Sequence, residues 1–182
     1  MKITKGQIAP DFSTQDVYNT PIQLSTYKGK KIVVSFFRNV SCPFCNLRVH
    51  ELIKRKAEFD KQNLQMIFFF ESSAKLLLLS SFHQGISPIP LISDPEKQIY
   101  QLYSVEASML KMLKTILAPN TFRMLEEGKK LGLPAQDKAA TISLMPADFL
   151  IDENFVIQVA HYGQNMADHI AIEDIIKFAN SK

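Results

Sequence analysis

Two strongly apolar segments with an amphipathic stretch between them constrain the fold of this chain more than any other feature. Residues 32–37 and 64–70 are runs of β-branched, aromatic and aliphatic residues, the pattern of strands buried on both faces of a parallel sheet. Between them, Cys45, Val49, Leu52, Ile53 and Phe59 recur at helical spacing. A strand–helix–strand unit of this kind closes right-handed and predicts an α/β protein.

The remaining segments add elements around this unit. In chain order we expect short strands within residues 11–31, a helix over 72–82, a short strand over 90–93, a helix capped by Asp94, two helical stretches within 105–131 parted by Pro119-Asn120, a loop over 132–143, a hairpin within 147–160 and a final helix over 168–179. The sequence therefore predicts one domain over residues 1–182. Its central mixed β-sheet is flanked by helices in three layers, with an N-terminal strand extension and a helical insertion at about 106–140.

Composition restricts the class of partner. The formal net charge is +3 at pH 7, the basic clusters are short and Trp is absent, so nothing indicates a nucleic-acid-binding surface. The longest apolar runs are too short to span a bilayer, and we expect no membrane association. The first residues lack the apolar stretch of a secretory signal, which makes the cytoplasm the expected location.

The two cysteines lie three positions apart, at the junction between the first buried strand and the helix. Pro43 suits the first helical position, which makes Cys42 the N-cap. The free N–H groups of the first turn and the positive end of the helix dipole then favour a thiolate on Cys42. Cys45 lies on the inward stripe. We expect Cys42 to be the exposed, low-pKa nucleophile and Cys45 to be the buried, less acidic resolving thiol.

A Cys-x-x-Cys pair also forms half of many zinc sites, so a metal-binding module is the competing class. Such a site needs two further ligands, and the chain has no second cysteine pair. His50 is a candidate third ligand, but it lies about 140° around the helix from Cys45. We expect no metal and no cofactor.

Residues 36–48, which include the Cys42-Pro43-Phe44-Cys45 motif, resemble the active-site segment of peroxiredoxin-like proteins of the alkyl hydroperoxide reductase and thiol-specific antioxidant family. Three further segments are similar to that family: residues 9–12, 90–95 and 145–152. The resemblance implies a thioredoxin-like fold in which Cys42 is the attacking thiol. It also implies that Met145–Pro146 is a cis peptide facing the dithiol, as at the start of the equivalent strand in relatives.

The chain departs from the full peroxiredoxin motif at three places. The positions seven and three residues before Cys42 hold Ser35 and Asn39, where the family has Pro and either Thr or Ser. Pro146 stands where the family places an arginine, and Arg38 is the candidate substitute. We therefore assign Cys42, Cys45, Arg38 and Asn39 as catalytic. The substrate-binding candidates are Pro43, Phe44, Met145 and Pro146.

The predicted activity is that of a thiol-dependent oxidoreductase with antioxidant, peroxiredoxin-like function, reducing hydroperoxides through the Cys42/Cys45 dithiol. The alternative enzyme is a thiol-disulfide oxidoreductase acting on protein disulfides. Either requires an external thiol reductant such as thioredoxin. The apolar face around Met109 and Leu117 is expected to pack on the sheet; a lid, a substrate groove or a homodimer contact are its alternatives.

Overall fold

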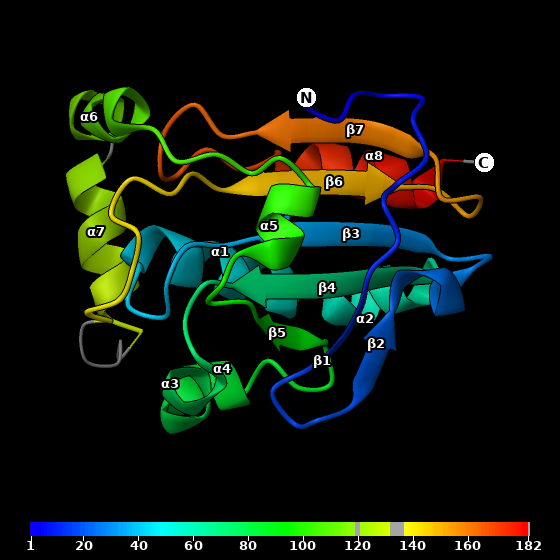
Figure 1. Cartoon of the computed structure of the whole chain (residues 1–182), viewed down its shortest axis with the longest axis horizontal. Helices are drawn as coiled ribbons and strands as arrows, with labels where there is room; N and C mark the ends of the chain where they lie inside the picture. Colours follow the sequence, from blue (N-terminus) through cyan, green and yellow to red (C-terminus); the bar gives the residue numbers. More distant parts are fainter. Residues whose placement is uncertain (119–120, 132–136, 182) are drawn as a thin grey trace.

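The computed structural model describes residues 1–118, 121–131 and 137–181. Its centre is a five-stranded mixed sheet in the order β5-β4-β3-β6-β7 (Figure 1). The strands are β3 (Lys31–Phe36), β4 (Leu64–Phe70), β5 (Leu91–Ser93), β6 (Ala147–Ile151) and β7 (Ile157–Tyr162). β3, β4 and β5 are parallel, whereas β6 is antiparallel to both β3 and β7. The predicted α/β class with a mixed central sheet is confirmed.

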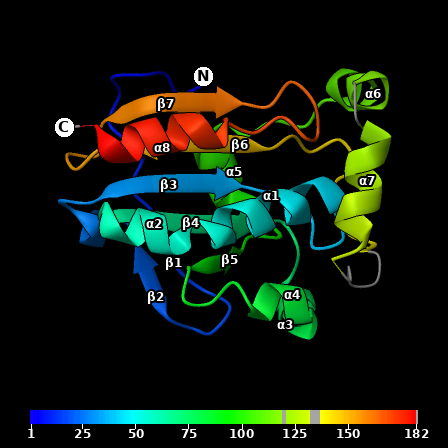
Figure 2. The same ribbon diagram turned by 180° about the vertical axis from the view of Figure 1, so that it is seen from behind.

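Helices cover both faces of this sheet. Seen from behind in Figure 2, α1 (Pro43–Lys54), α2 (Lys56–Lys61) and α8 (Ile172–Asn180) lie in front of the strands. The short helix α5 (Gln98–Leu102) lies on the opposite face. The N-terminal extension consists of β1 (Ser13–Gln15), β2 (Pro21–Gln23) and the 3-10 helix η1 (Leu24–Tyr27). α3 (Ala74–Leu79) and α4 (Ser81–Gln84) lie beside the β5 edge.

Strand β3 explains why the core has two halves. All six of its residues are buried, as its continuous apolar pattern predicts. Because side chains alternate along a strand, Val33 packs into the half beneath α1 and α8, while Ile32 and Val34 pack into the half beneath α5. Each such side chain contributes about 1.5–3 kcal/mol when fully buried.

Three predicted helices differ from those observed. The helical stretch that begins at Pro43 is interrupted at Arg55, which ends α1 and precedes α2. The single helix expected over 72–82 is wrong, because Ser80 separates α3 from α4 in an extended conformation. The last helix starts at Ile172 rather than at residue 168. In contrast, the Asp94 carboxylate accepts hydrogen bonds from the first three N–H groups of α5. Asp94 therefore caps this helix, as the sequence predicts.

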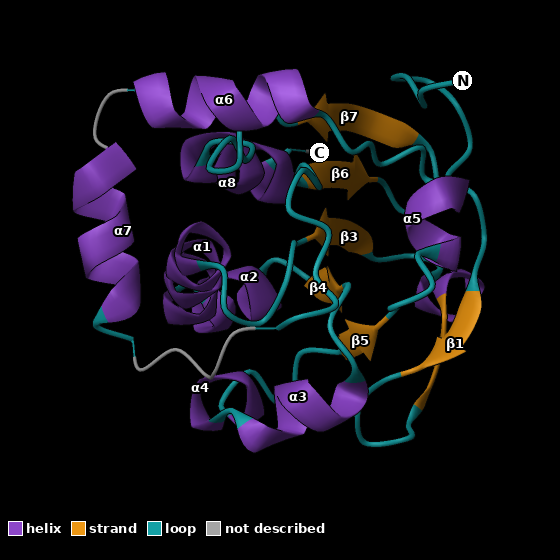
Figure 3. Cartoon of the chain, turned by 60° about the vertical axis from the view of Figure 1, so that its left-hand side comes forward, coloured by secondary structure: helices purple, strands orange, loops and turns teal. Residues whose placement is uncertain are grey.

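The helical segment within 106–140 lies at the end of the sheet where β3 and β4 finish. It contains α6 (Met109–Leu117) and α7 (Thr121–Lys129) (Figure 3). α7 packs along α1, but the expected packing of the apolar face of α6 on the sheet is wrong. Five of its large apolar side chains are between 53% and 85% exposed: Met109, Leu110, Leu113, Ile116 and Leu117. The predicted break at Pro119-Asn120 and residues 132–136 of the predicted loop lie outside the described residues.

No helix in the described part of the chain is both long enough and apolar enough to cross a bilayer.

Candidate active site

Cys42 lies at the junction of the loop after β3 with α1. Its backbone is extended, with φ −73° and ψ 112°, and Pro43 is the first helical residue. The Cys42 Sγ accepts a hydrogen bond from the N–H of Cys45 at 3.4 Å. The predicted N-cap role of Cys42 is therefore confirmed, and its sulfur occupies the place where a helix start favours negative charge.

The two thiols are free and face each other. Their Sγ atoms lie 2.8 Å apart, with Cys45 donating to Cys42. Cys45 is fully buried, as predicted from its place on the inward stripe. The prediction that Cys42 is exposed is wrong, because only 3% of its surface is accessible. A reactant that reaches its sulfur must therefore be small, or the surroundings must move.

Arg38 comes from the loop directly after β3 and supplies a positive charge beside Cys42. Its Nη1 donates to the Cys42 Sγ at 3.4 Å. Its Nε and Nη2 donate to the carbonyl oxygens of Leu144 and Ile142 at 2.8 and 2.6 Å. The residue is only 7% exposed, so these hydrogen bonds compensate for the loss of water around the guanidinium. The geometry thus gives Arg38 a fixed orientation toward the sulfur.

The two thiols have strongly different acidities. Burial alone raises the pKa of Cys42, but the hydrogen bond from Cys45, the charge of Arg38 and the N–H of Cys45 together lower it to about 6. Burial raises the pKa of Cys45 well above its ordinary value, and the adjacent Cys42 raises it further. At neutral pH, Cys42 is therefore the thiolate and Cys45 keeps its proton, as the sequence predicts.

A cavity of about 290 Å³ opens beside Cys42. Its lining residues are Arg38, Asn39, Ser41, Cys42, Pro43, Asp137, Lys138, Ala140 and Ile142. The Oδ1 atom of Asn39 accepts hydrogen bonds from the N–H and hydroxyl of Ser41, at 3.2 and 2.9 Å. Four of the eight site residues predicted from the sequence, Arg38, Asn39, Cys42 and Pro43, meet in this polar cavity.

The other predicted binding residues lie elsewhere. Met145 is 1% exposed and Pro146 is also buried, and neither lines the cavity beside Cys42. The prediction of a cis Met145–Pro146 peptide is wrong: in the described residues the cis peptide is Ser87–Pro88. The carbonyl of Pro146 accepts the N–H of Gly163, so this segment is held against the turn after β7.

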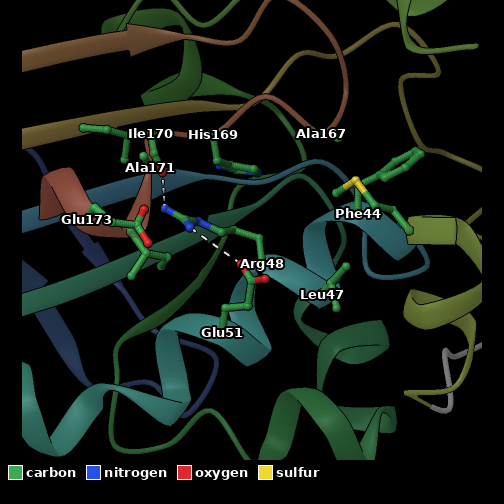
Figure 4. A pocket seen from close by; sticks show the side chains of 11 residues that line it. Phe44, Leu47, Arg48, Glu51, Ala167, His169, Ile170, Ala171 and Glu173 are labelled. Atoms are coloured by element: carbon green, nitrogen blue, oxygen red, sulfur yellow. Dashed lines mark hydrogen bonds and ion pairs between the residues drawn. The ribbon is translucent and has the colours of Figure 1, made fainter. Parts of the chain in front are cut away.

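Phe44 lines a second cavity, of about 310 Å³, between α1 and the segment that leads into α8 (Figure 4). Arg48 enters this cavity and donates from Nη2 to the Ile170 carbonyl at 2.5 Å. Arg48 is not one of the apolar residues that recur at helical spacing in this segment, yet it is only 7% exposed. The apolar spacing of α1 could not show this, because a buried arginine depends on a carbonyl from a distant segment.

Asp148 anchors the same region from inside the sheet. Its fully buried carboxylate accepts hydrogen bonds from His169 Nδ1 at 2.9 Å and from the Ile170 N–H at 3.0 Å. Burial alone raises the pKa of Asp148, but the adjacent His169 and Arg48 hold it well below its usual range. This cluster ties the second turn of α1 to β6 and to the segment before α8, and so supports the helix that carries both cysteines.

The sequence predictions missed two acidic residues near the dithiol. Glu71 follows β4 directly and is 5% exposed; Asp137 lines the cavity and accepts a hydrogen bond from Ser72 at 2.5 Å. The place of Glu71 at the carboxyl end of a parallel strand is a signal that could have identified it. Asp137 lies in a loop with no such signal.

The metal-binding alternative requires a third ligand near the two thiols. Across residues 1–118, 121–131 and 137–181, no group of three or more His, Cys, Asp or Glu side chains is placed to hold a metal ion. His50 therefore does not join Cys42 and Cys45 in a ligand set in this part of the chain.

Comparisons with known proteins agree with this geometry. The sequence profile described as the AhpC/TSA family matches residues 5–160. A peroxiredoxin of Thermoplasma volcanium is 26% identical over 188 aligned positions, covering 85% of this chain and 92% of the relative. The thiol-disulfide oxidoreductase ResA of Bacillus subtilis is 23% identical over 127 residues, covering 70% of this chain and 65% of ResA. The crystal structure of peroxidoxin BcpB from Mycobacterium tuberculosis superposes with a TM-score of 0.67 at 14% identity, covering 97% and 96%.

Proposed function

The chain belongs to the AhpC/TSA family, and from this we propose that it is a thiol-dependent peroxidase. It reduces small hydroperoxides through Cys42 and Cys45. The observation that carries the proposal is the Cys42 Sγ itself. It accepts hydrogen bonds from the Cys45 thiol, the Cys45 N–H and Arg38, and it borders a polar cavity. These donors keep a buried sulfur ionised at neutral pH, which is the state that attacks an O–O bond.

In the first step, the Cys42 thiolate attacks one peroxide oxygen. An S–O bond forms as the O–O bond breaks, and the departing oxygen takes up a proton to leave as an alcohol or water. Cys42 becomes a sulfenic acid, so sulfur is oxidised and the peroxide is reduced by two electrons. Arg38 and Asn39 are the proposed donors to the peroxide oxygens, because both line the cavity beside the sulfur.

In the second step, the Cys45 sulfur attacks the oxidised Cys42 sulfur. The S–S bond forms and hydroxide leaves as water after protonation. The pKa of Cys45 is raised by its burial and by the thiolate of Cys42, and oxidation removes the thiolate contribution while Arg38 remains. Oxidation of Cys42 therefore makes Cys45 easier to deprotonate at the stage when it must react. An external dithiol, for which thioredoxin is the proposed example, then reduces the disulfide.

The second candidate is a thiol-disulfide oxidoreductase. The Cys-x-x-Cys pair and the similarity to ResA favour it. The 3% exposure of Cys42 favours the peroxidase, because a protein disulfide must reach the sulfur directly, whereas a small peroxide needs only the cavity. The geometry therefore supports hydroperoxides as the primary substrate.

We extend the proposal to the setting of the enzyme. The proposed enzyme is one domain over residues 1–182, in which the helical segment 106–140 is an insertion. Its proposed location is the cytoplasm, where reducing conditions return the dithiol to its active form. The exposed apolar face of α6 leaves a homodimer contact as one arrangement to be measured in solution.

Thiol stoichiometry tests the proposed chemistry. One equivalent of hydrogen peroxide should remove both titratable thiols of the reduced protein and produce an intramolecular disulfide. Cys42→Ser should lose almost no thiol on the same timescale. Rapid loss of the Cys45 thiol in Cys42→Ser would contradict the assigned roles.

A further inference from the structure

Arg38 depends on a short turn that lies far from it in the sequence. Residues 141–144 form this turn, closed by a hydrogen bond from the Leu144 N–H to the Thr141 carbonyl at 3.1 Å. Two carbonyls of the turn, those of Ile142 and Leu144, accept the Nη2 and Nε protons of Arg38. The direction in which Nη1 points toward Cys42 is therefore set by where this turn lies.

Glu71 holds both ends of this arrangement. Its backbone N–H donates to the Arg38 carbonyl at 3.1 Å, and its Oε2 accepts the N–H of Thr141, the first residue of the turn, at 3.0 Å. The side chain is 5% exposed, and its Oε1 atom is buried with no hydrogen-bond partner among the described residues. Burying a carboxyl group with one oxygen unpaired costs free energy. A smaller polar side chain could accept the Thr141 N–H at a lower cost, so capping the turn alone does not explain a glutamate at this position.

The charges around Arg38 explain why a carboxylate at this place is tolerated. Burial lowers the pKa of Arg38, but Cys42 and Cys45 and, more weakly, Glu71 raise it, so the guanidinium stays charged. Asp137 and Lys138 also line the cavity that Arg38 borders. When oxidation removes the negative charge of Cys42, Glu71 and Asp137 are acidic groups that remain near Arg38.

We propose that Glu71 is a positioning residue that holds the Arg38 guanidinium beside Cys42 by fixing the turn of residues 141–144. The inference rests on the proposed role of Arg38 at the thiolate. Segment 106–108 also contacts the turn and the residue that follows it: the Ser108 N–H donates to the Ser143 carbonyl, and the Met145 N–H donates to the Glu106 carbonyl. The test must therefore ask whether those contacts suffice without Glu71.

The test is the pH dependence of Cys42 ionisation, followed by thiolate absorbance and by the alkylation rate. Glu71→Ala frees the turn and should raise the Cys42 pKa from its value of about 6 toward the value of about 8.5 for free cysteine. Glu71→Gln keeps an oxygen for the Thr141 N–H and removes a negative charge, so the Cys42 pKa should stay the same or fall. A general loss of packing would shift the Cys42 pKa in the same direction in both variants.

Two controls separate this inference from the proposed function. Glu153→Ala removes a carboxylate from the hairpin at the opposite end of the sheet and should leave the Cys42 pKa unchanged. In an Arg38→Met background, Glu71→Ala should add no further rise, because both changes act through the same guanidinium.

The outcomes are distinct. If Arg38→Met raises the Cys42 pKa but Glu71→Ala does not, the positioning role of Glu71 is wrong and the site assignment stands. If Arg38→Met has no effect, the proposed role of Arg38 fails first. If Glu71→Ala does not fold, Glu71→Gln decides alone: a rise in the Cys42 pKa in that variant overturns the inference.

Discussion

The Sγ atoms of Cys42 and Cys45 lie 2.8 Å apart in the reduced protein, with the Cys45 thiol donating its proton toward Cys42. A disulfide bond is about 2.05 Å long, so less than 1 Å of further approach closes it. Because Cys42 is the N-cap of α1 and Cys45 lies in its first turn, the bond can form without unwinding the helix. The proposed resolution of Cys42 by Cys45 therefore needs only a local movement at this site.

Removing the resolving sulfur should trap the first oxidation product. In Cys45→Ser, peroxide should leave Cys42 as a sulfenic acid, because no thiol lies close enough to displace it. Mass spectrometry after treatment with a sulfenic-acid-specific reagent should find one adduct on Cys42. The wild type should carry far less adduct, because the disulfide forms first. Equal labelling of both proteins would show that Cys45 does not resolve Cys42.

Arg38→Met should raise the Cys42 pKa, because it removes both a positive charge and a hydrogen bond that stabilise the thiolate. The expected direction is from about 6 toward about 8.5, with a matching loss of alkylation rate at neutral pH. Arg55→Met is the matched control, since Arg55 lies between α1 and α2, where its exposed side chain is paired with Glu58 of α2. A Cys42 pKa that is the same in all three proteins would rule out the assigned role of Arg38.

His83 should make folding stability sensitive to acid. The residue is fully buried beside Phe70, and burial lowers its pKa from 6.5 to about 4. Between these values the unfolded chain binds more protons than the folded one, so stability is complete above pH 6.5 and falls as the pH approaches 4. The largest loss is about 3 kcal/mol.

Urea unfolding at several pH values measures this dependence. His83→Leu should flatten the slope of stability against pH across the window from 6.5 to 4, whatever its effect on absolute stability. An unchanged slope in His83→Leu would mean that other groups cause the acid sensitivity.

Gly128 allows α7 to approach the start of α1. A Cβ atom at this position would lie 2.5 Å from the Pro43 carbonyl oxygen and 2.7 Å from the Pro43 Cβ. Because these are backbone and ring atoms, Gly128→Ala should displace α7, with a loss of about 1–3 kcal/mol. Alkylation of Cys42 should become faster as the helix start is uncovered. Glu126→Ala on the exposed face of α7 is the control, and equal effects in both variants would contradict the account.

The sequence was sufficient for the parts of the fold whose signals are local. The central strands could be predicted from residues 32–37 and 64–70, because a short, continuously apolar run is typical of a strand buried on both faces. Pro43 and Asp94 marked helix starts, since each acts on backbone groups within a few residues. The N-cap position of Cys42 and the buried position of Cys45 followed from the same local rules.

The parts that could not be predicted depend on contacts between distant segments. Cys42 is buried where Arg38 and residues 137–142 come together around it, and no local pattern in the sequence predicts that contact between distant segments. Arg48 is buried because the Ile170 carbonyl receives its proton. The apolar spacing in α6 predicts a helix that packs against the core. Whether that face is buried depends on where the helix lies relative to the sheet, and the spacing of apolar residues does not specify this.

Stopped-flow oxidation of the reduced protein tests the central claim most directly, with hydrogen peroxide and a protein disulfide compared at the same pH. One well-positioned donor is worth roughly 10²–10³ in rate in other enzymes, so Arg38 should make the peroxide reaction at least about a hundredfold faster than that of free cysteine. Asn39 in place of the family's Thr or Ser should keep it slower than in peroxiredoxins with the full motif. Cys42→Ser should abolish the fast phase. A peroxide rate no greater than that of free cysteine, together with rapid exchange with the protein disulfide, would contradict the peroxidase account.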